Sequence, residues 1–151
     1  MASKSILHKF DSRKVGLLIS ILGIFGSLYF SEVLKYAPCV LCWYQRIALY
    51  PLAIIYGVAL WTDDRFYFKY SFLFIIIGTL LAIYHNLLYF GMIAQTIAPC
   101  SEDGSSCTAR QLELFGFLTI PLLSLITFTT IGAADILSLK TNRLKVGYNE
   151  K

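Results

Sequence analysis

The chain has 151 residues, of which 57% are hydrophobic and only 15% are charged. This composition is too apolar for a soluble domain of this size and is typical of a protein that lies mostly in a lipid bilayer. The formal net charge of +4 comes from basic residues at the two ends and in short clusters. The positive charge is therefore expected to set orientation in a membrane, and no nucleic-acid partner is predicted.

Four stretches of the chain are long and apolar enough to cross a bilayer, which needs about 20 mostly apolar residues per helix. The four predicted helices cover about residues 15–34, 42–61, 70–90 and 114–136. Basic tails, 1–14 and 138–151, flank them. We therefore predict an all-α integral membrane four-helix bundle, with one transmembrane domain over residues 15–137.

Basic residues are distributed unevenly between the two ends of these predicted helices. Ten of the 13 lysines and arginines lie in the two tails or in the turn between the second and third helices. Because Lys and Arg concentrate in cytoplasmic segments, both termini are predicted to be cytoplasmic. All four cysteines lie in or beside the other two connections and would face outward, where disulfides persist.

Cys39 and Cys42 form a Cys-x-x-Cys motif at the start of the second predicted helix. At this spacing two side chains share one face of a helix. The N-terminal end of a helix carries partial positive charge, and Arg46 adds a fixed charge one turn below Cys42. Both effects lower the pKa of a thiol, whereas burial raises it. The motif therefore predicts a reactive dithiol or disulfide.

Cys100 and Cys107 bracket a six-residue polar loop between the third and fourth predicted helices. Four cysteines allow three pairings, and proximity favours Cys39–Cys42 and Cys100–Cys107. Taken alone, the second pair could be a structural staple that contributes about 2–3 kcal/mol. Beside a reactive pair, however, it could pass electrons through mixed disulfides.

A structural zinc site that uses all four cysteines is an alternative reading of the two pairs. The six-residue separation of the second pair is wide for a zinc knuckle. An outward, oxidising location also disfavours zinc. No metal is therefore expected.

Arg46 and His85 are ionisable residues inside predicted membrane helices, where such residues usually mark function. From the helix rise, Arg46 lies about 6 Å below Cys42, and His85 about 9 Å below the outer end of its own helix. Two polar groups beneath a dithiol could frame an electron acceptor with carbonyl oxygens. The alternatives are an Arg46 that extends to lipid headgroups and a His85 that bonds within its helix.

Three further residues of the predicted helices receive non-functional interpretations. Asp135 lies at the inner end of the fourth helix and is interpreted as a solvated boundary charge. Pro51 and Pro121 fall inside the second and fourth helices, where they predict local kinks.

The sequence contains no nucleotide-binding fingerprint, no haem motif and no metal-cluster motif. A lipid-soluble quinone is a natural two-electron acceptor inside a bilayer. By elimination, we predict a quinone as the electron acceptor.

The segment Pro-Cys-Val-Leu-Cys-Trp-Tyr-Gln-Arg at 38–46 resembles the signature of the DsbB/BdbC disulfide bond formation proteins. So do Tyr84-His85, the cysteine pair in the second outer loop, and Phe-Gly-Phe-Leu-Thr-Ile-Pro at 115–121. The resemblance covers about residues 15–137. It implies a four-helix protein of the bacterial plasma membrane that reoxidises an extracytoplasmic thioredoxin-like disulfide oxidase, DsbA- or BdbD-like. The electrons would pass to menaquinone or ubiquinone, supporting disulfide formation in exported proteins.

The resemblance also implies a role for each cysteine. Cys100 would be attacked by the partner's cysteine, and Cys107 would help to resolve the mixed disulfide. Cys39 and Cys42 would then accept the electrons, with Cys42 nearest the quinone.

The same resemblance implies roles for two polar residues. Arg46 would stabilise the Cys42 thiolate and a quinone oxygen, and His85 matches a histidine near the quinone. One feature departs from the family pattern, because the Cys-x6-Cys loop is much shorter than in proteobacterial members. In this respect the chain resembles the compact Gram-positive branch.

Two other protein classes remain as alternatives. Vitamin-K-epoxide-reductase-like proteins also pair loop cysteines with a membrane Cys-x-x-Cys, but they carry that motif in their last helices. A non-enzymatic membrane carrier or scaffold would use its cysteines only as structural disulfides.

Overall fold

The computed structural model describes residues 11–64, 66–93, 113–114 and 118–149. Its elements in chain order are α2 (Ser12–Leu28), the π-helix η1 (Tyr29–Val33), α3 (Val40–Trp61), α4 (Phe68–Tyr89), β1 (Glu113–Leu114), β2 (Leu118–Thr119) and α5 (Ile120–Asn149). The two short strands pair antiparallel, with Glu113 opposite Thr119. The described part of the chain is otherwise helical, which confirms the predicted all-helical class in its main elements.

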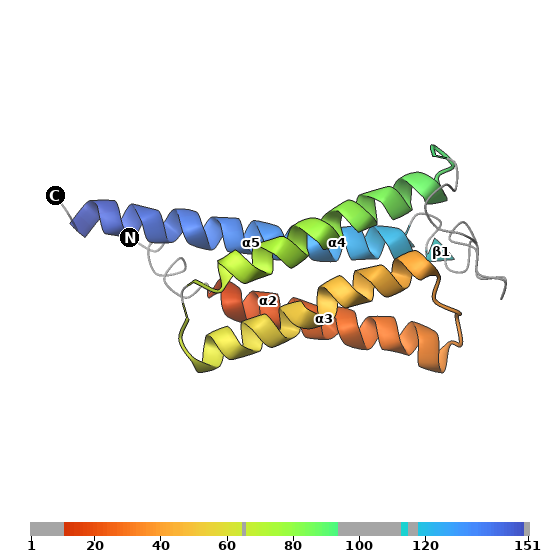
Figure 1. Cartoon of the computed structure of the whole chain (residues 1–151), viewed down its shortest axis with the longest axis horizontal. Coiled ribbons are helices and arrows are strands. Elements are labelled where there is room, and N and C mark those ends of the chain that lie inside the picture. The colour runs from red at the N-terminus through yellow and green to blue at the C-terminus, as the bar shows by residue number, and fades with distance from the viewer. Residues whose placement is uncertain (1–10, 65, 94–112, 115–117, 150–151) are drawn as a thin grey trace.

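The four long helices pack side by side, and each reverses the direction of the helix before it (Figure 1). α2 contacts α3 and α5, and α4 contacts the same two helices. One end of the helices carries Cys39 and Cys42 and is called the cysteine end below. The opposite end, where α2 begins and α5 ends, carries Ser12 and Asp135 and is called the aspartate end (Figure 1).

The core between the helices is apolar and closely packed. Leu52 and Tyr56 of α3 are fully buried, as are Phe128 and Ile131 of α5. Gly78 lets the ring of Phe128 pack directly against the backbone of α4, where any side chain would overlap that ring. The absence of a Cβ at this position therefore sets how closely α4 and α5 approach.

Large apolar side chains also point outward along all four helices, as Phe25, Ile54, Leu80 and Leu137 do. An exposed surface of this kind suits a lipid environment.

Three of the described helical segments are long and apolar enough to cross a membrane, namely Ser12–Val33, Phe68–Tyr89 and Ile120–Lys140. α3 is not among them, because Gln45, Arg46 and several tyrosines reduce its hydropathy. Three of the four predicted spans are therefore confirmed as span-capable by length and composition. The membrane span predicted over residues 42–61, which form most of α3, remains a prediction.

The first and second helices begin slightly earlier than predicted, and the cause is capping. Asp11 caps α2 by accepting a hydrogen bond from the backbone N–H of Arg13 at 3.1 Å. Cys39 caps α3 by accepting one from the backbone N–H of Cys42 at 3.4 Å. Side-chain caps of this kind satisfy N–H groups that have no partner within the helix.

The prediction for the fourth helix is wrong at both ends. α5 begins at Ile120, not at 114, because Pro121 suits a first helical turn and Thr119 accepts a hydrogen bond from the Leu122 N–H at 3.4 Å. Pro121 is therefore not a mid-helix kink, whereas Pro51 does lie inside α3. The helix continues to 149, and the segment after 138 contains no proline that would interrupt it.

Asp135 is fully buried, so its interpretation as a solvated boundary charge is wrong. Its carboxylate accepts hydrogen bonds from Tyr56 at 2.8 Å, Ser71 at 2.9 Å and Tyr67 at 3.3 Å. The Tyr67 hydroxyl also bonds to Ser12 Oγ, so this network joins all four helices. Asp135 therefore lies in the interior of α5 and not at its end, and its side chain is buried in the core.

Candidate functional site

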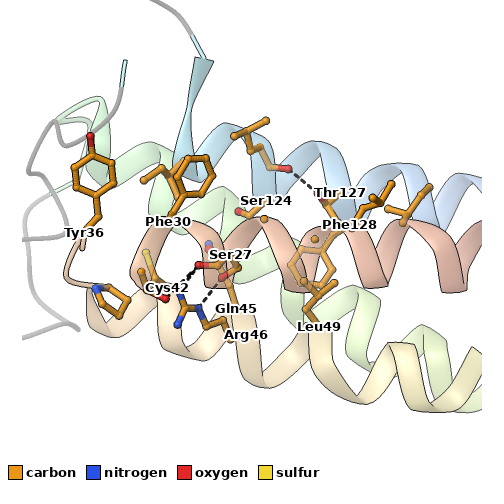
Figure 2. A pocket seen from close by; sticks show the side chains of 18 of the residues that line it. Ser27, Phe30, Tyr36, Cys42, Gln45, Arg46, Leu49, Ser124, Thr127 and Phe128 are labelled. Carbon is orange, nitrogen blue, oxygen red and sulfur yellow. Dashed lines mark hydrogen bonds between the residues drawn. The ribbon is translucent and has the colours of Figure 1, made fainter. Parts of the chain in front are cut away.

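A cavity of about 370 Å³ lies at the cysteine end, between α2, α3, α5 and the segment that joins η1 to α3 (Figure 2). Leu49 and Phe128 contribute apolar lining, and Cys42, Gln45 and Arg46 contribute polar lining. The cavity is therefore largely apolar, with a thiol and two N–H donors along one side.

The capping position of Cys39 brings the two cysteines of the motif together. Their Sγ atoms lie 3.1 Å apart. Cys39 is 6% exposed and packs with Leu41 and Leu88, whereas Cys42 is partly exposed and lines the cavity. Of the two sulfurs, the Cys42 sulfur is the one positioned to react with a molecule in the cavity.

Cys39 does not have the lowered thiol pKa that the sequence predicts for a helix N-terminus. Its hydrogen bond with Cys42, together with burial, raises the pKa of Cys39 to about 12, although His85 acts in the opposite direction. Cys39 therefore keeps its proton at neutral pH when the pair is reduced.

Arg46 lines the cavity and is held by α2 (Figure 2). Its Nε donates to Ser27 Oγ at 2.6 Å, and its Nη2 donates to the Ser27 carbonyl oxygen at 2.8 Å. The guanidinium also lies 5.3 Å from the ring centroid of Trp43. With 8% exposure, Arg46 is buried in the protein and does not extend outward as the headgroup alternative requires.

His85 lies beside the cysteine pair but is not among the residues that line the cavity. Its Nε2 is 3.8 Å from Cys39 Sγ, and its Nδ1 is 3.3 Å from Gln45 Nε2. His85 therefore contacts the cysteine pair through Cys39, whereas Arg46 lines the cavity that Cys42 also lines. Of the two residues predicted to frame one acceptor, Arg46 lines the cavity, and the role of His85 toward a quinone stays a prediction.

Gln45 and Ser27 are site residues that the sequence reasoning missed. Gln45 lines the cavity and also contacts His85, so it lies between the cavity and the histidine beside Cys39. Its position three residues after Cys42 could have predicted a place on the same helix face. Ser27 lies on a different helix, and nothing in its local sequence indicates a contact with Arg46.

Cys100 and Cys107, the predicted second pair, lie outside the described residues. Their pairing and their proposed contact with a partner protein remain predictions.

The sequence model of the family described as "Disulfide bond formation protein DsbB" matches residues 13–137. The chain belongs to the DsbB family. This match confirms the resemblance seen in the motif at 38–46. It also makes the chain a disulfide-forming oxidoreductase by family, and three of its described helical segments are able to span a membrane.

Curated relatives of this DsbB-family chain carry the same kind of name. It is 42% identical to "Disulfide bond formation protein C" of Bacillus subtilis, over 76% of this chain and 82% of the relative. It is 39% identical to "Probable disulfide formation protein C 1" of Bacillus anthracis, over 80% and 86%. A "Probable disulfide formation protein" of Metapseudomonas resinovorans is 39% identical, over 76% and 80%. No solved structure matches the chain significantly.

Proposed function

We propose that this DsbB-family protein reoxidises an extracytoplasmic thioredoxin-like disulfide oxidase, DsbA- or BdbD-like, and passes the electrons to a membrane quinone. The observation that carries the proposal is the presence of Cys42 and Arg46 together in the lining of one apolar cavity. The proposal includes a transmembrane bundle of all four helices, with both termini cytoplasmic and the cysteine end facing outward.

The cavity suits the head group of a quinone in its size and donor set. Quinone rings are flat and apolar, with two carbonyl oxygens that accept hydrogen bonds. Leu49 and Phe128 contribute apolar contact, and Arg46 and Gln45 carry N–H groups. Small-molecule pockets are usually apolar with a few polar groups that set orientation. Either menaquinone or ubiquinone would meet these requirements.

The proposed electron route begins with two thiols of the partner oxidase. They would reduce the Cys100–Cys107 disulfide, and the resulting thiols would reduce the Cys39–Cys42 disulfide by thiol–disulfide exchange. A bound quinone would then accept the two electrons and two protons released when Cys39 and Cys42 close their disulfide again. Each transfer therefore oxidises one dithiol and leaves the oxidised partner ready for another substrate.

In this proposal the two cysteines of the motif have separate tasks. Cys42 lines the cavity one helical turn from the cationic Arg46, which favours its thiolate form. Cys39 would keep its proton until the disulfide forms, and His85 Nε2, 3.8 Å away, would accept it once the Gln45 amide turns its Oε1 toward Nδ1–H. In this proposal His85 acts on the dithiol, not on a quinone oxygen.

Stopped-flow oxidation of a reduced thioredoxin-like partner, with and without added quinone, tests the function. We expect several turnovers of partner oxidation only when quinone is present in excess. Equal multiple-turnover rates in the absence of both quinone and oxygen would contradict the assigned acceptor. A partner with a single cysteine should be trapped as a mixed disulfide, and mass spectrometry would identify the cysteine that it attacks.

A further inference from the structure

A compact group of metal-ligating atoms lies at the cysteine end, beside the cavity. The Sγ atoms of Cys39 and Cys42 and a ring nitrogen of His85 all lie within 4.8 Å of one another. Cys39 Sγ is 3.1 Å from Cys42 Sγ and 3.8 Å from His85 Nε2. His85 is 46 residues away from Cys39 along the chain and only 2% exposed. The third donor is therefore a product of the fold and is invisible in the Cys-x-x-Cys spacing.

These distances are close to those that a tetrahedral zinc ion requires. Zinc binds thiolate sulfur at about 2.3 Å and imidazole nitrogen at about 2.0 Å, which places a sulfur and a nitrogen about 3.5 Å apart and two sulfurs about 3.8 Å apart. The distance from Cys39 Sγ to His85 Nε2 exceeds the first of these values by only about 0.3 Å. The two sulfurs need to separate by only about 0.7 Å to fit as well, which a small side-chain rotation achieves.

The second nitrogen of His85 is also held, as it is in many zinc sites. Gln45 Nε2 lies 3.3 Å from Nδ1. A metal-bound histidine donates its other ring N–H to an acceptor that fixes the ring orientation, and Gln45 supplies this acceptor when its side-chain amide turns so that Oε1 faces Nδ1. The described residues therefore contribute three ligands and one orienting contact, and leave a fourth coordination position for water.

We propose that reduced Cys39 and Cys42 bind Zn²⁺ together with His85, and that the bound ion stops the oxidase in its reduced state. Binding releases the two thiol protons to solvent and involves no change of oxidation state. A closed Cys39–Cys42 disulfide withdraws both sulfur ligands, so the site exists only in the reduced protein. The inhibitory part of this proposal rests on the proposed function, whereas the binding part does not.

Metal binding is measured first, with Co²⁺ as a coloured probe and Zn²⁺ as its competitor. The full-length protein carries Cys100→Ser and Cys107→Ser, so that only the motif cysteines remain, and is kept in detergent without quinone. After anaerobic reduction with a phosphine, we expect one Co²⁺ per chain, a thiolate-to-cobalt absorption band and displacement by Zn²⁺. The same protein with the Cys39–Cys42 disulfide closed should show no band.

The contribution of His85 is measured in the same background. His85→Gln should lower the affinity for Co²⁺ by about tenfold or more, because a ligand is lost. His8→Gln, which changes the chain's other histidine, is the matched control and should leave the affinity unchanged. Circular dichroism establishes that the variants are folded, and Cys39→Ser replaces His85→Gln if the latter is not. Equal affinity in His85→Gln, or equal binding to the oxidised protein, would overturn the site.

Inhibition is measured separately, in the four-cysteine protein. We expect micromolar Zn²⁺ to slow partner oxidation and a chelator to restore the rate. The fractional loss of rate should be at least fivefold smaller in His85→Gln, relative to that variant's own rate without zinc. Zinc that binds without slowing turnover would overturn the inhibitory role alone. A protein that binds Co²⁺ in its reduced state but never oxidises the partner would instead contradict the proposed function.

Discussion

The cysteine end and the aspartate end both bury polar side chains from several helices, but they use them in opposite ways. At the aspartate end, the Asp135 carboxylate accepts three hydroxyl hydrogen bonds within a closed network. At the cysteine end, Arg46 and Gln45 border a cavity of about 370 Å³. A closed network stabilises the fold, because each buried polar group has a partner. Donors beside a cavity are instead positioned to bind another molecule.

This contrast predicts that variants at the two ends fail differently. Changes at the cysteine end should reduce turnover while the protein stays folded. Changes at the aspartate end should reduce stability, while the protein that remains folded stays active. The experiments below test this separation, in order of decreasing expected effect.

Cys42→Ser should abolish turnover completely, because no disulfide can then form at the cavity. Partner oxidation assays would measure the loss, and thermal unfolding in detergent should change little, because Ser has nearly the same shape. A scaffold with purely structural disulfides would keep its function in this variant. Turnover that survives the substitution would therefore remove Cys42 from the electron route.

Asp135→Ala should cause the largest loss of stability, because it leaves Tyr56, Tyr67 and Ser71 without their shared acceptor. Tyr67 also bonds to Ser12 Oγ, and Ser71 also donates to the Phe68 carbonyl at 3.4 Å, so Tyr56 is the donor left unsatisfied. A buried donor without a partner costs about 1–3 kcal/mol, and we expect a loss of that size. Denaturant unfolding in detergent, followed by circular dichroism, measures this loss. Asp135→Asn keeps one oxygen acceptor and should lose less. If the Ala variant is as stable as the parent, the network does not stabilise the fold.

Arg46→Met should weaken quinone use while partner binding remains. A hydrogen bond from a charged group contributes about 1.5–3 kcal/mol, so the KM for quinone should rise about tenfold to a hundredfold. Steady-state kinetics at varied quinone concentration measures this change, and the KM for the partner protein serves as the internal control. A rise in the KM for the partner with an unchanged KM for quinone would contradict a role of Arg46 in quinone binding.

Ser27→Ala should have the smallest effect. It removes the acceptor at 2.6 Å from Arg46 Nε but leaves the backbone carbonyl that accepts from Nη2 at 2.8 Å. We expect a loss of about 0.7 kcal/mol, which corresponds to about a threefold rise in the KM for quinone. The same kinetic assay measures it, and a rise as large as in Arg46→Met would show that Ser27 alone positions the guanidinium.

The motif chemistry could be predicted from the sequence because its residues are close together in the chain. Cys39, Cys42 and Arg46 lie within two helical turns, so helix geometry alone places them near one another. Gln45 follows the same rule and was predictable, although no role was assigned to it. The contacts of Ser27 and His85 were not predictable in this way, because each depends on how separate helices pack.

Asp135 shows why an interpretation from position alone fails. It lies near the end of the longest apolar stretch in its segment, where a charged residue usually marks the boundary of a membrane helix. The structure extends α5 to 149 and turns the carboxylate toward Tyr56, Ser71 and Tyr67. Whether a charge is solvated or paired depends on the partners that other helices bring to it, and those partners lie more than 60 residues away along the chain.

The sequence alone specifies the helical class, three segments able to span a membrane, the DsbB family and the Cys-x-x-Cys motif. These properties follow from composition, from apolar run length and from spacings within one helix. The packing of the helices is needed to show that Cys42 lines the cavity, that Arg46 is held by Ser27 and that His85 lies against Cys39. Contacts between helices depend on their relative rotation and depth, and local spacing carries no information about either.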